Sequence, residues 1–283
     1  MRRTAWLNAL LAVAVAALGA WAYLKPSNER AAEYPLSALK PAEARSIRIE
    51  RGAGAPVVLE RKDDAWFLVS PFAARAEPAR VRALLDILEA TTPHRFAATD
   101  LQRFELASPR ARLTVNEQSF GFGMVSPVTR EQYVLTAEAV FAVHPRYGTA
   151  LPPRGSELAS RGLFAPGETP VRIGLGTFAV EQRDGQWTSS PPGSAASPDD
   201  LARWMEEWRL ATALRVEPAD KTKALETIRV RLKSGGTLSL HVLAREPQLV
   251  ILREDENLQF AFPPETAARL LSPPVTRKVT RDQ

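Results

Sequence analysis

Hydrophobic and polar positions along the chain follow two different periods. Short segments such as 46–51 and 228–232 alternate apolar and charged residues, which is the pattern of strands with one buried face. Two longer segments place apolar residues at helical spacing, so that each forms one stripe. The stripes are Val81, Leu84, Leu85 and Leu88 in the first segment, and Leu201, Trp204, Met205 and Trp208 in the second. Many short strands with few helices predict an α+β fold.

The same order of features occurs twice at a nearly constant offset. Trp66 and Trp187 lie 121 positions apart, and Pro78 and Pro198 lie 120 apart. Proline suits the first turn of a helix, and Ser197 is placed to cap the second one. This order indicates an internal duplication. We expect two tandem copies of a strand-rich unit with one central amphipathic helix, preceded by an N-terminal transmembrane helix.

These patterns divide the chain into six expected segments. They are a transmembrane anchor at 1–25, a stalk at 26–45, a first repeat domain at 46–151, a Pro/Gly linker at 152–169, a second repeat domain at 170–272 and a polar tail at 273–283. The linker is placed where the periodicity stops and prolines and glycines accumulate.

The N-terminal segment predicts where the protein is found. Two arginines precede an apolar run at 5–24, which as a helix is about 30 Å long, the thickness of a bilayer's hydrocarbon core. Trp6 and Trp21 lie near its ends, where aromatic rings favour the membrane interface. A cleaved signal peptide is the alternative, with Ala20-Trp21-Ala22 as its cleavage site. The length of the run favours an uncleaved signal-anchor, with the bulk of the chain exported.

Composition and charge exclude several classes of protein. The chain is 45% hydrophobic and 24% charged, which is typical of a globular protein. Its formal charge of +5 includes three cations and no acid in residues 1–25, so 34 basic residues face 32 acidic ones in the remainder. This near balance does not predict nucleic-acid binding. The lack of cysteine excludes disulfides, thiolate metal sites and a lipid-modified N-terminal cysteine.

Short motifs for catalysis or phosphate binding fail on their context. Ser37-Ala38-Leu39-Lys40 matches S-x-x-K, and Lys233-Ser234-Gly235 resembles a K-T-G box, but they fall in a predicted stalk and a hairpin turn. Gly121-Phe122-Gly123 and Gly174-Leu175-Gly176 lack the full spacing of a phosphate loop and open no helix. Glycines in or beside strands, at bulges or tight turns, are the favoured interpretation.

The titratable residues do not predict a catalytic or metal centre either. His94, His144 and His241 are not spaced as ligands on one element. Asp63-Asp64 and Asp199-Asp200 are explained by a turn and by a helix start. We expect no catalytic residue, no cofactor and no metal.

Three tryptophans are the candidates for contact with a ligand or partner. Trp204 and Trp208 are one helical turn apart, and Trp187 belongs to the same unit. Aromatic rings so spaced can floor a sugar- or peptide-binding groove. The helix pair also matches Leu84 and Leu88 of the first unit, so packing in the core is the favoured interpretation.

The chain resembles a bacterial envelope family, domain of unknown function 4340 (DUF 4340), over roughly residues 45–270. The resemblance lies in Ile47-Arg48-Ile49, the charged turn into Trp66 with Ser70-Pro71, Pro78 and its helix, the run from Asp100 to Pro109, and the strands at 120–123, 133–135 and 140–143. In the Asp100 run the family's usual glycine is replaced by Glu105. The resemblance implies a membrane anchor and a repeated domain, and no established catalytic residues. Some members are found beside components of ABC-type transporters, including ones linked to gliding motility.

These observations lead to three hypotheses of function. The first is a non-enzymatic, single-pass protein of the bacterial inner membrane, with its bulk in the periplasm, acting as a binding or scaffold subunit of an envelope transport or assembly complex. Its expected partners are the membrane and an ABC-type transporter or other envelope protein. The second is a module that binds an envelope glycan or peptide. The third, and least favoured, is an envelope hydrolase.

Overall fold

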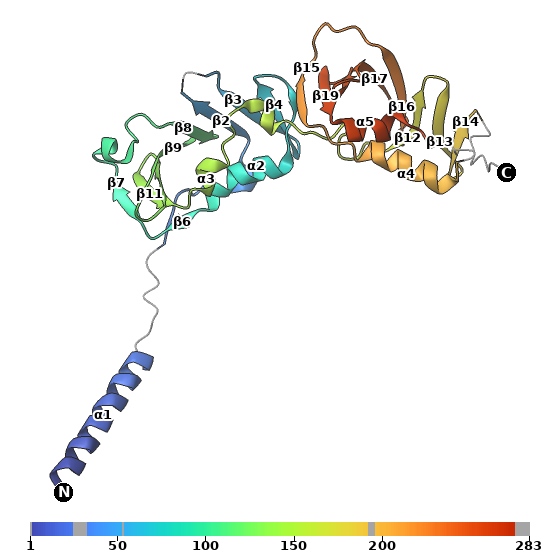
Figure 1. Ribbon diagram of the computed structural model, residues 1–283. Coiled ribbons are helices and arrows are strands. Elements are labelled where there is room, and N and C mark those ends of the chain that lie inside the picture. The colour runs from blue at the N-terminus through green and yellow to red at the C-terminus, as the bar shows by residue number, and fades with distance from the viewer. Residues whose placement is uncertain (1, 25–32, 53, 192–195, 275–283) are drawn as a thin grey trace.

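The N-terminal residues of the chain form an α-helix. The computed structural model describes residues 2–24, 33–52, 54–191 and 196–274 (Figure 1). Helix α1 spans Arg2–Leu24. Within the described residues, no helix combines the length and apolar character that crossing a membrane requires. The predicted anchor therefore stays a prediction. Residues 26–32 of the expected stalk and 275–283 of the expected tail lie outside the described residues.

Residues 33–151 form the first lobe, which is built on one antiparallel sheet (blue to green in Figure 1). The sheet has nine strands among the described residues. In order across the sheet they are β5 (Ala74–Arg75), β4 (Ala65–Ser70), β3 (Val57–Lys62), β2 (Ser46–Arg51), β8 (Ala111–Val115), β9 (Gln118–Val125), β10 (Gln132–Leu135), β11 (Ala139–Val143) and β7 (Arg95–Ala97). A separate short pair joins β1 (Tyr34–Pro35) to β6 (Thr91–Thr92).

Residues 170–274 form the second lobe, on an antiparallel sheet of eight strands within the described residues (yellow to red in Figure 1). In order they are β14 (Gln186–Ser190), β13 (Phe178–Arg183), β12 (Pro170–Leu175), β16 (Glu226–Leu232), β17 (Thr237–Ala244), β18 (Leu249–Arg253), β19 (Leu258–Phe262) and β15 (Arg215–Pro218). This order repeats that of the first sheet from β4 to β7. Only β5, at the edge beside β4, has no described counterpart.

Helices cover one face of the sheet in each lobe. Helix α2 (Pro78–Leu85) continues into the 3₁₀ helix η2 (Asp86–Glu89), and α4 (Pro198–Arg209) packs against α5 (Pro264–Leu271). All eight residues of the two predicted stripes are buried. The α4 start is capped as predicted, because the backbone N–H of Asp200 donates to Oγ of Ser197 at 3.2 Å.

The two lobes share one continuous apolar core, and segments expected to be stalk and linker contribute to it. Leu36 and Ala44, from the expected stalk, are buried against the first lobe. Leu158 and Leu163, from the expected linker, are fully buried as well. Prolines and glycines interrupt regular structure here, but the apolar side chains between them still gain by burial. We call residues 152–169 the connecting segment.

The opposite face of the first sheet is covered by a loop. The loop contains the 3₁₀ helix η3 (Leu101–Phe104), and its Phe104 and Leu106 form a small second core with Val140. A Cβ atom at Gly123 would lie 2.2 Å from the carbonyl oxygen of Phe104. Only glycine lets the loop lie this close to the strand. Gly121 and Gly123 therefore let the loop pack closely, and Gly123 also lies where the register between β9 and β10 shifts, which agrees with the predicted bulge.

Candidate functional site at the junction between the lobes

The structure brings Trp204 and Trp208 together in the core of the second lobe. Their rings are 6.1 Å apart and nearly perpendicular, and both are buried. Each indole N–H donates to the carbonyl oxygen of Leu270 in α5, both at 3.2 Å. Trp187, on β14, is half-buried and packs against the same core. The two helical tryptophans thus tie α4 to α5 and offer no open aromatic floor.

Each of the three histidines has a polar partner of its own. Nδ1 of His94 is 3.1 Å from the carboxylate of Glu131, and Nε2 of His241 is 3.3 Å from that of Glu254. His144 accepts a hydrogen bond from the neighbouring backbone. Among the described residues, no group of three histidine or acidic side chains is placed to hold a metal ion.

Residues of the S-x-x-K match and of the Asp63-Asp64 pair have structural contacts. Ser37 hydrogen-bonds to Gln118 and accepts from the backbone N–H of Leu39. The backbone N–H of Lys40 donates to Glu43. Asp63 lies in a turn with a positive φ of 52°. The position of Asp63 agrees with the predicted turn, whereas Ser37, from the expected stalk, contacts the first lobe.

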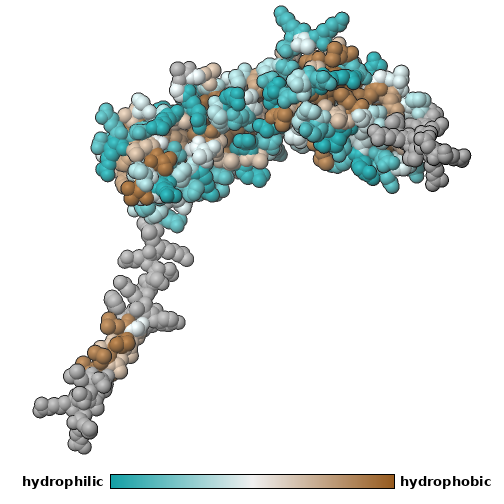
Figure 2. All heavy atoms as spheres, in the orientation of Figure 1, coloured by the Kyte–Doolittle hydropathy of each residue, from teal (hydrophilic) through white to brown (hydrophobic). Residues whose placement is uncertain are grey.

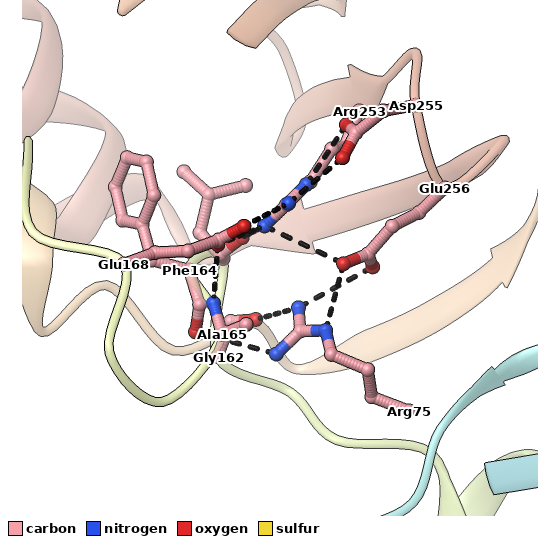
Figure 3. A network of polar contacts seen from close by, with 9 residues as sticks. Arg75, Gly162, Phe164, Ala165, Glu168, Arg253, Asp255 and Glu256 are labelled. Carbon is pink, nitrogen blue, oxygen red and sulfur yellow. Dashed lines mark hydrogen bonds and ion pairs between the residues drawn. The ribbon is translucent and has the colours of Figure 1, made fainter. Parts of the chain in front are cut away.

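The most buried charge described is Arg253, at the end of β18, which is only 2% exposed. Its guanidinium forms bidentate pairs with two carboxylates (Figure 3). Nη1 and Nη2 each lie 2.7 Å from Glu168, and Nε and Nη2 lie 3.0 and 2.9 Å from Asp255. Nη1 also donates to the carbonyl oxygen of Leu163 at 2.8 Å. These contacts use all five N–H donors of the side chain.

A second arginine carries this network across to the first lobe. Arg75 lies on β5, and its Nε donates to Oε1 of Glu256 in the β18–β19 turn at 2.7 Å. Its Nη2 donates to the carbonyl oxygen of Gly162 in the connecting segment at 2.8 Å. The same Oε1 of Glu256 lies 3.4 Å from Nη1 of Arg253, so this carboxylate lies between the two arginines (Figure 3).

Backbone hydrogen bonds tie the connecting segment to both lobes. On the first-lobe side, the N–H of Ser160 donates to the carbonyl oxygen of Arg75 at 2.7 Å. On the second-lobe side, the N–H of Leu163 donates to Ala211 at 3.0 Å, and that of Ala213 donates to Arg161 at 2.8 Å. The connecting segment thus pairs with each lobe in turn. We call these contacts, together with the two arginines and their carboxylates, the junction.

Three groups of the junction, Glu168, Asp255 and Arg253, have pKa values shifted toward their charged forms. Burial raises the pKa of Glu168, but hydrogen bonds from Arg253 and from the Ala165 N–H, with the nearby positive charges, bring it below its ordinary value of 4.5. The pKa of Asp255 is likewise lowered, with burial opposed by its hydrogen bonds from Arg253. Burial lowers the pKa of Arg253, and its bonds to both carboxylates outweigh that effect and raise it.

This arrangement is suited to coupling the lobes rather than to chemistry. A general acid or base needs a proton-transfer group with a pKa near the working pH, whereas these carboxylates are more acidic than usual. A buried ion pair is costly to break, because removal of one partner leaves the other charge buried and unpaired. The junction therefore favours one fixed arrangement of the two sheets.

Reasoning from the sequence missed the junction, although one signal pointed to it. Leu249, Ile251 and Arg253 alternate on one face of a strand, so the arginine continues a face that is otherwise apolar. A charge at such a position predicts a buried partner. The partners come from distant parts of the chain, and no local spacing identifies them.

Comparison with known proteins shows the family of the chain. A family model described as "Domain of unknown function (DUF4340)" matches residues 66–230, which is more than half of the 283 residues. No curated protein matches the chain. No solved structure matches it. The matched range starts in β4, includes Arg75 and the whole connecting segment, and ends in β16. The chain belongs to the DUF4340 family.

Proposed function

We propose that this protein is a non-enzymatic, membrane-tethered binding or scaffold subunit of an envelope transport or assembly complex. The observation that carries the proposal is the junction, which holds two sheets of the same strand order in one body. A protein that presents two surfaces to a partner gains affinity when their spacing is fixed in advance, because less conformational freedom is lost on binding. A fully paired, buried ion network supplies that rigidity.

The tether in this proposal is helix α1. Its 23 residues correspond to about 35 Å at the rise of an α-helix. Apolar side chains described on it, including Leu10, Leu11 and Val13, are about two-thirds exposed (brown on the helix in Figure 2). A bilayer would bury such side chains. The proposed location is the bacterial inner membrane, crossed once, with both lobes in the periplasm and Arg2 and Arg3 on the cytoplasmic side.

The other two hypotheses have less support. An aromatic platform needs exposed rings, and those of Trp204 and Trp208 are buried with their N–H groups already bonded. A hydrolase needs its acids, bases or nucleophile in one site, and each ring of the three histidines is paired with a separate neighbour among the described residues. Binding of a protein partner, for example an ABC-type transporter, is therefore the favoured activity.

Affinity capture with a matched pair of variants tests the proposal. Tagged full-length protein is recovered from solubilised membranes, and each co-purifying protein is then tested for direct binding in purified form. Arg75→Gln removes the charge that links the lobes, whereas Arg154→Gln removes an exposed ion pair with Glu157 at 3.7 Å. We expect the wild type and Arg154→Gln to bind one reproducible partner, and Arg75→Gln to bind it at least about fivefold more weakly, a loss near 1 kcal/mol.

Three outcomes count against this proposal. Recovery of no reproducible, directly binding partner would contradict the binding function. If Arg75→Gln lowers the unfolding midpoint but binds the partner as tightly as the wild type does, then the partner does not require the fixed junction. Absence of the full-length protein from the membrane fraction would contradict the proposal that α1 anchors it in the membrane.

A further inference from the structure

The face of the second sheet opposite α4 and α5 is rich in arginine on three neighbouring strands. The cations of this face are Arg172 in β12, Arg183 in β13, Arg229 and Arg231 in β16, and Lys233 in the turn after β16. Buried and exposed residues alternate along β16, so its two arginines lie on the side away from the core. We call these five residues, together with Glu181 in β13, the basic face.

One carboxylate serves three of these cations. Arg231 donates to Oε1 of Glu181 at 2.5 Å, and Arg172 and Arg183 donate to its Oε2 at 3.3 and 3.4 Å. The hydrogen bond from Arg231 is the main cause that holds the pKa of Glu181 below its ordinary value of 4.5. A single negative charge balances one of the three guanidinium groups, so two positive charges remain.

Two arginines of the basic face lie directly opposite each other in the sheet. Arg172 in β12 pairs with Arg231 in β16. Like charges at such positions destabilise a sheet. The first lobe lacks this arrangement, because Arg48 in the corresponding strand β2 faces Thr114 and bonds to Glu50 at 2.8 Å. The second lobe thus carries a repulsive pair that the shared fold does not require.

The acids around the basic face do not neutralise it. Glu226, at the start of β16, pairs with Arg245 at 2.5 Å, and Glu254 lies 3.3 Å from His241. Asp184 lies in the β13–β14 turn. If it is counted with the carboxylate of the face itself, five cations still stand against two acids. The face is therefore complementary to a partner with negative charge.

The geometry of the basic face favours the carboxylates of a protein as that charge. Guanidinium groups bind carboxylates through charge-assisted hydrogen bonds, and three of them already do so here. Arg229 and Arg231 are two residues apart on one strand, which corresponds to about 7 Å. An extended peptide with an acid at every second position has the same spacing. Among the described residues, none of the exposed large hydrophobic side chains belongs to β12, β13 or β16, so this face has no apolar group to insert into a lipid surface.

We propose that the basic face binds an extended, acidic segment of a protein partner. Carboxylates of the segment pair with Arg229 and Lys233, which are exposed and have no ion pair within the part of the chain that the structure describes. Further carboxylates offset the repulsion between Arg172 and Arg231. The inference rests on the proposed binding function and names the surface of the second lobe that carries it.

The test uses a capped hexapeptide of alternating glutamate and threonine, labelled for fluorescence anisotropy, with the full-length protein in neutral detergent at low salt. Arg231→Thr introduces a residue that strands favour and that the first sheet has at this position. We expect this variant to bind the peptide at least about fivefold more weakly than the wild type. Its unfolding midpoint should stay the same or rise, because the repulsion with Arg172 is removed. Arg112→Thr, an exposed arginine of β8 in the first lobe, is the matched control and should leave binding unchanged.

A second variant decides the matter if Arg231→Thr fails to fold. The double substitution Arg229→Gln and Lys233→Gln removes two exposed charges without breaking a described ion pair, and we expect it to weaken binding at least about threefold. Raising the salt from about 0.05 to about 0.3 M should weaken the binding of the wild type as well, because salt screens exposed charges. A hexapeptide with lysine in place of glutamate should bind more weakly than the glutamate peptide. Equal binding of the two peptides, or equal binding by the folded variants and the wild type, would overturn the assignment.

The remaining outcomes separate this site from other occupants and from the proposed function. Absence of any wild-type binding at millimolar glutamate peptide overturns the assignment. If short-chain phosphatidylglycerol displaces the peptide at a lower concentration than the unlabelled peptide does, the face prefers a lipid headgroup and the protein segment is overturned. If a captured partner binds Arg231→Thr with full affinity, this site fails while the proposed function stands. If the peptide binds but no partner is ever captured, the proposed function fails while the site stands.

Discussion

The two lobes have the same strand order but cover their sheets differently. In the first lobe a helix lies on one face and the loop at 101–109 lies on the other, so β9 and β11 are largely buried on both sides. In the second lobe α4 and α5 cover one face. The opposite face carries Arg172, Glu181 and Arg231, which form ion pairs at the surface. One topology therefore supports two distributions of exposed surface.

Side-chain size explains much of this difference. In the first sheet Gly121 and Gly123 leave room for the loop, and a Cβ atom at either would meet that loop within 3 Å. In the second sheet a Cβ atom at Gly174 would lie 3.8 Å from its nearest neighbour, the carbonyl oxygen of Arg229, which is an ordinary contact distance. On the face covered by helices, the larger side chains belong to the second lobe. Two tryptophans in α4 take the place of leucines in α2, and they reach α5.

The largest expected effect comes from the helical side of the second lobe. Trp208→Ala removes a side chain that is 0% exposed, together with its hydrogen bond to Leu270, and should cost about 3–5 kcal/mol of stability. Trp187→Ala removes a half-buried ring on β14 and should cost nearer about 1 kcal/mol. Chemical unfolding followed by circular dichroism measures both. Similar losses for the two variants would show that α4 is not the centre of this core.

One glycine from each sheet gives a sharper test of the comparison. Gly123→Ala places a Cβ atom 2.2 Å from the carbonyl oxygen of Phe104, which is backbone and cannot rotate away, so we expect a loss of about 1–3 kcal/mol. Gly174→Ala has open space and should stay within about 0.5 kcal/mol of the wild type. The free energy of unfolding measures both. A neutral Gly123→Ala would mean that the loop does not pack on this strand in solution.

Local patterns in the sequence predicted most of the regular structure. Both helical stripes are buried, and the capped start at Ser197 and the alternating segments are where the periods placed them. These features depend on neighbours a few residues apart, which a single sequence displays. The short edge strands β5 and β7 went unpredicted because two or three residues carry no period.

The junction and the loop depend on contacts between distant residues, which a single sequence does not display. Arg75 and Glu256 are 181 positions apart, and no spacing rule relates them. The backbone conformation of Glu105 could not be predicted from the sequence either. Its φ of 56° lies in the left-handed region, which is why the family's usual glycine suits this position, but the sequence alone does not display that angle.

The smallest expected effect concerns pH and the junction that joins the lobes. The folded-state pKa of Glu168 is below its ordinary value of 4.5, so near that pH the unfolded chain binds more protons than the folded one. The contribution of Glu168 to stability is therefore fully present above about pH 4.5, and it is lost as the pH drops through the lowered pKa. Glu168→Gln cannot titrate, so its stability should depend less on pH between about 5 and 3 than that of the wild type. Glu60→Gln, an exposed carboxylate on β3, is the matched control and should follow the wild type. Unfolding midpoints across this range measure the slopes. If Glu168→Gln kept the full wild-type slope, the ion pair with Arg253 would contribute nothing to the coupling of the two lobes.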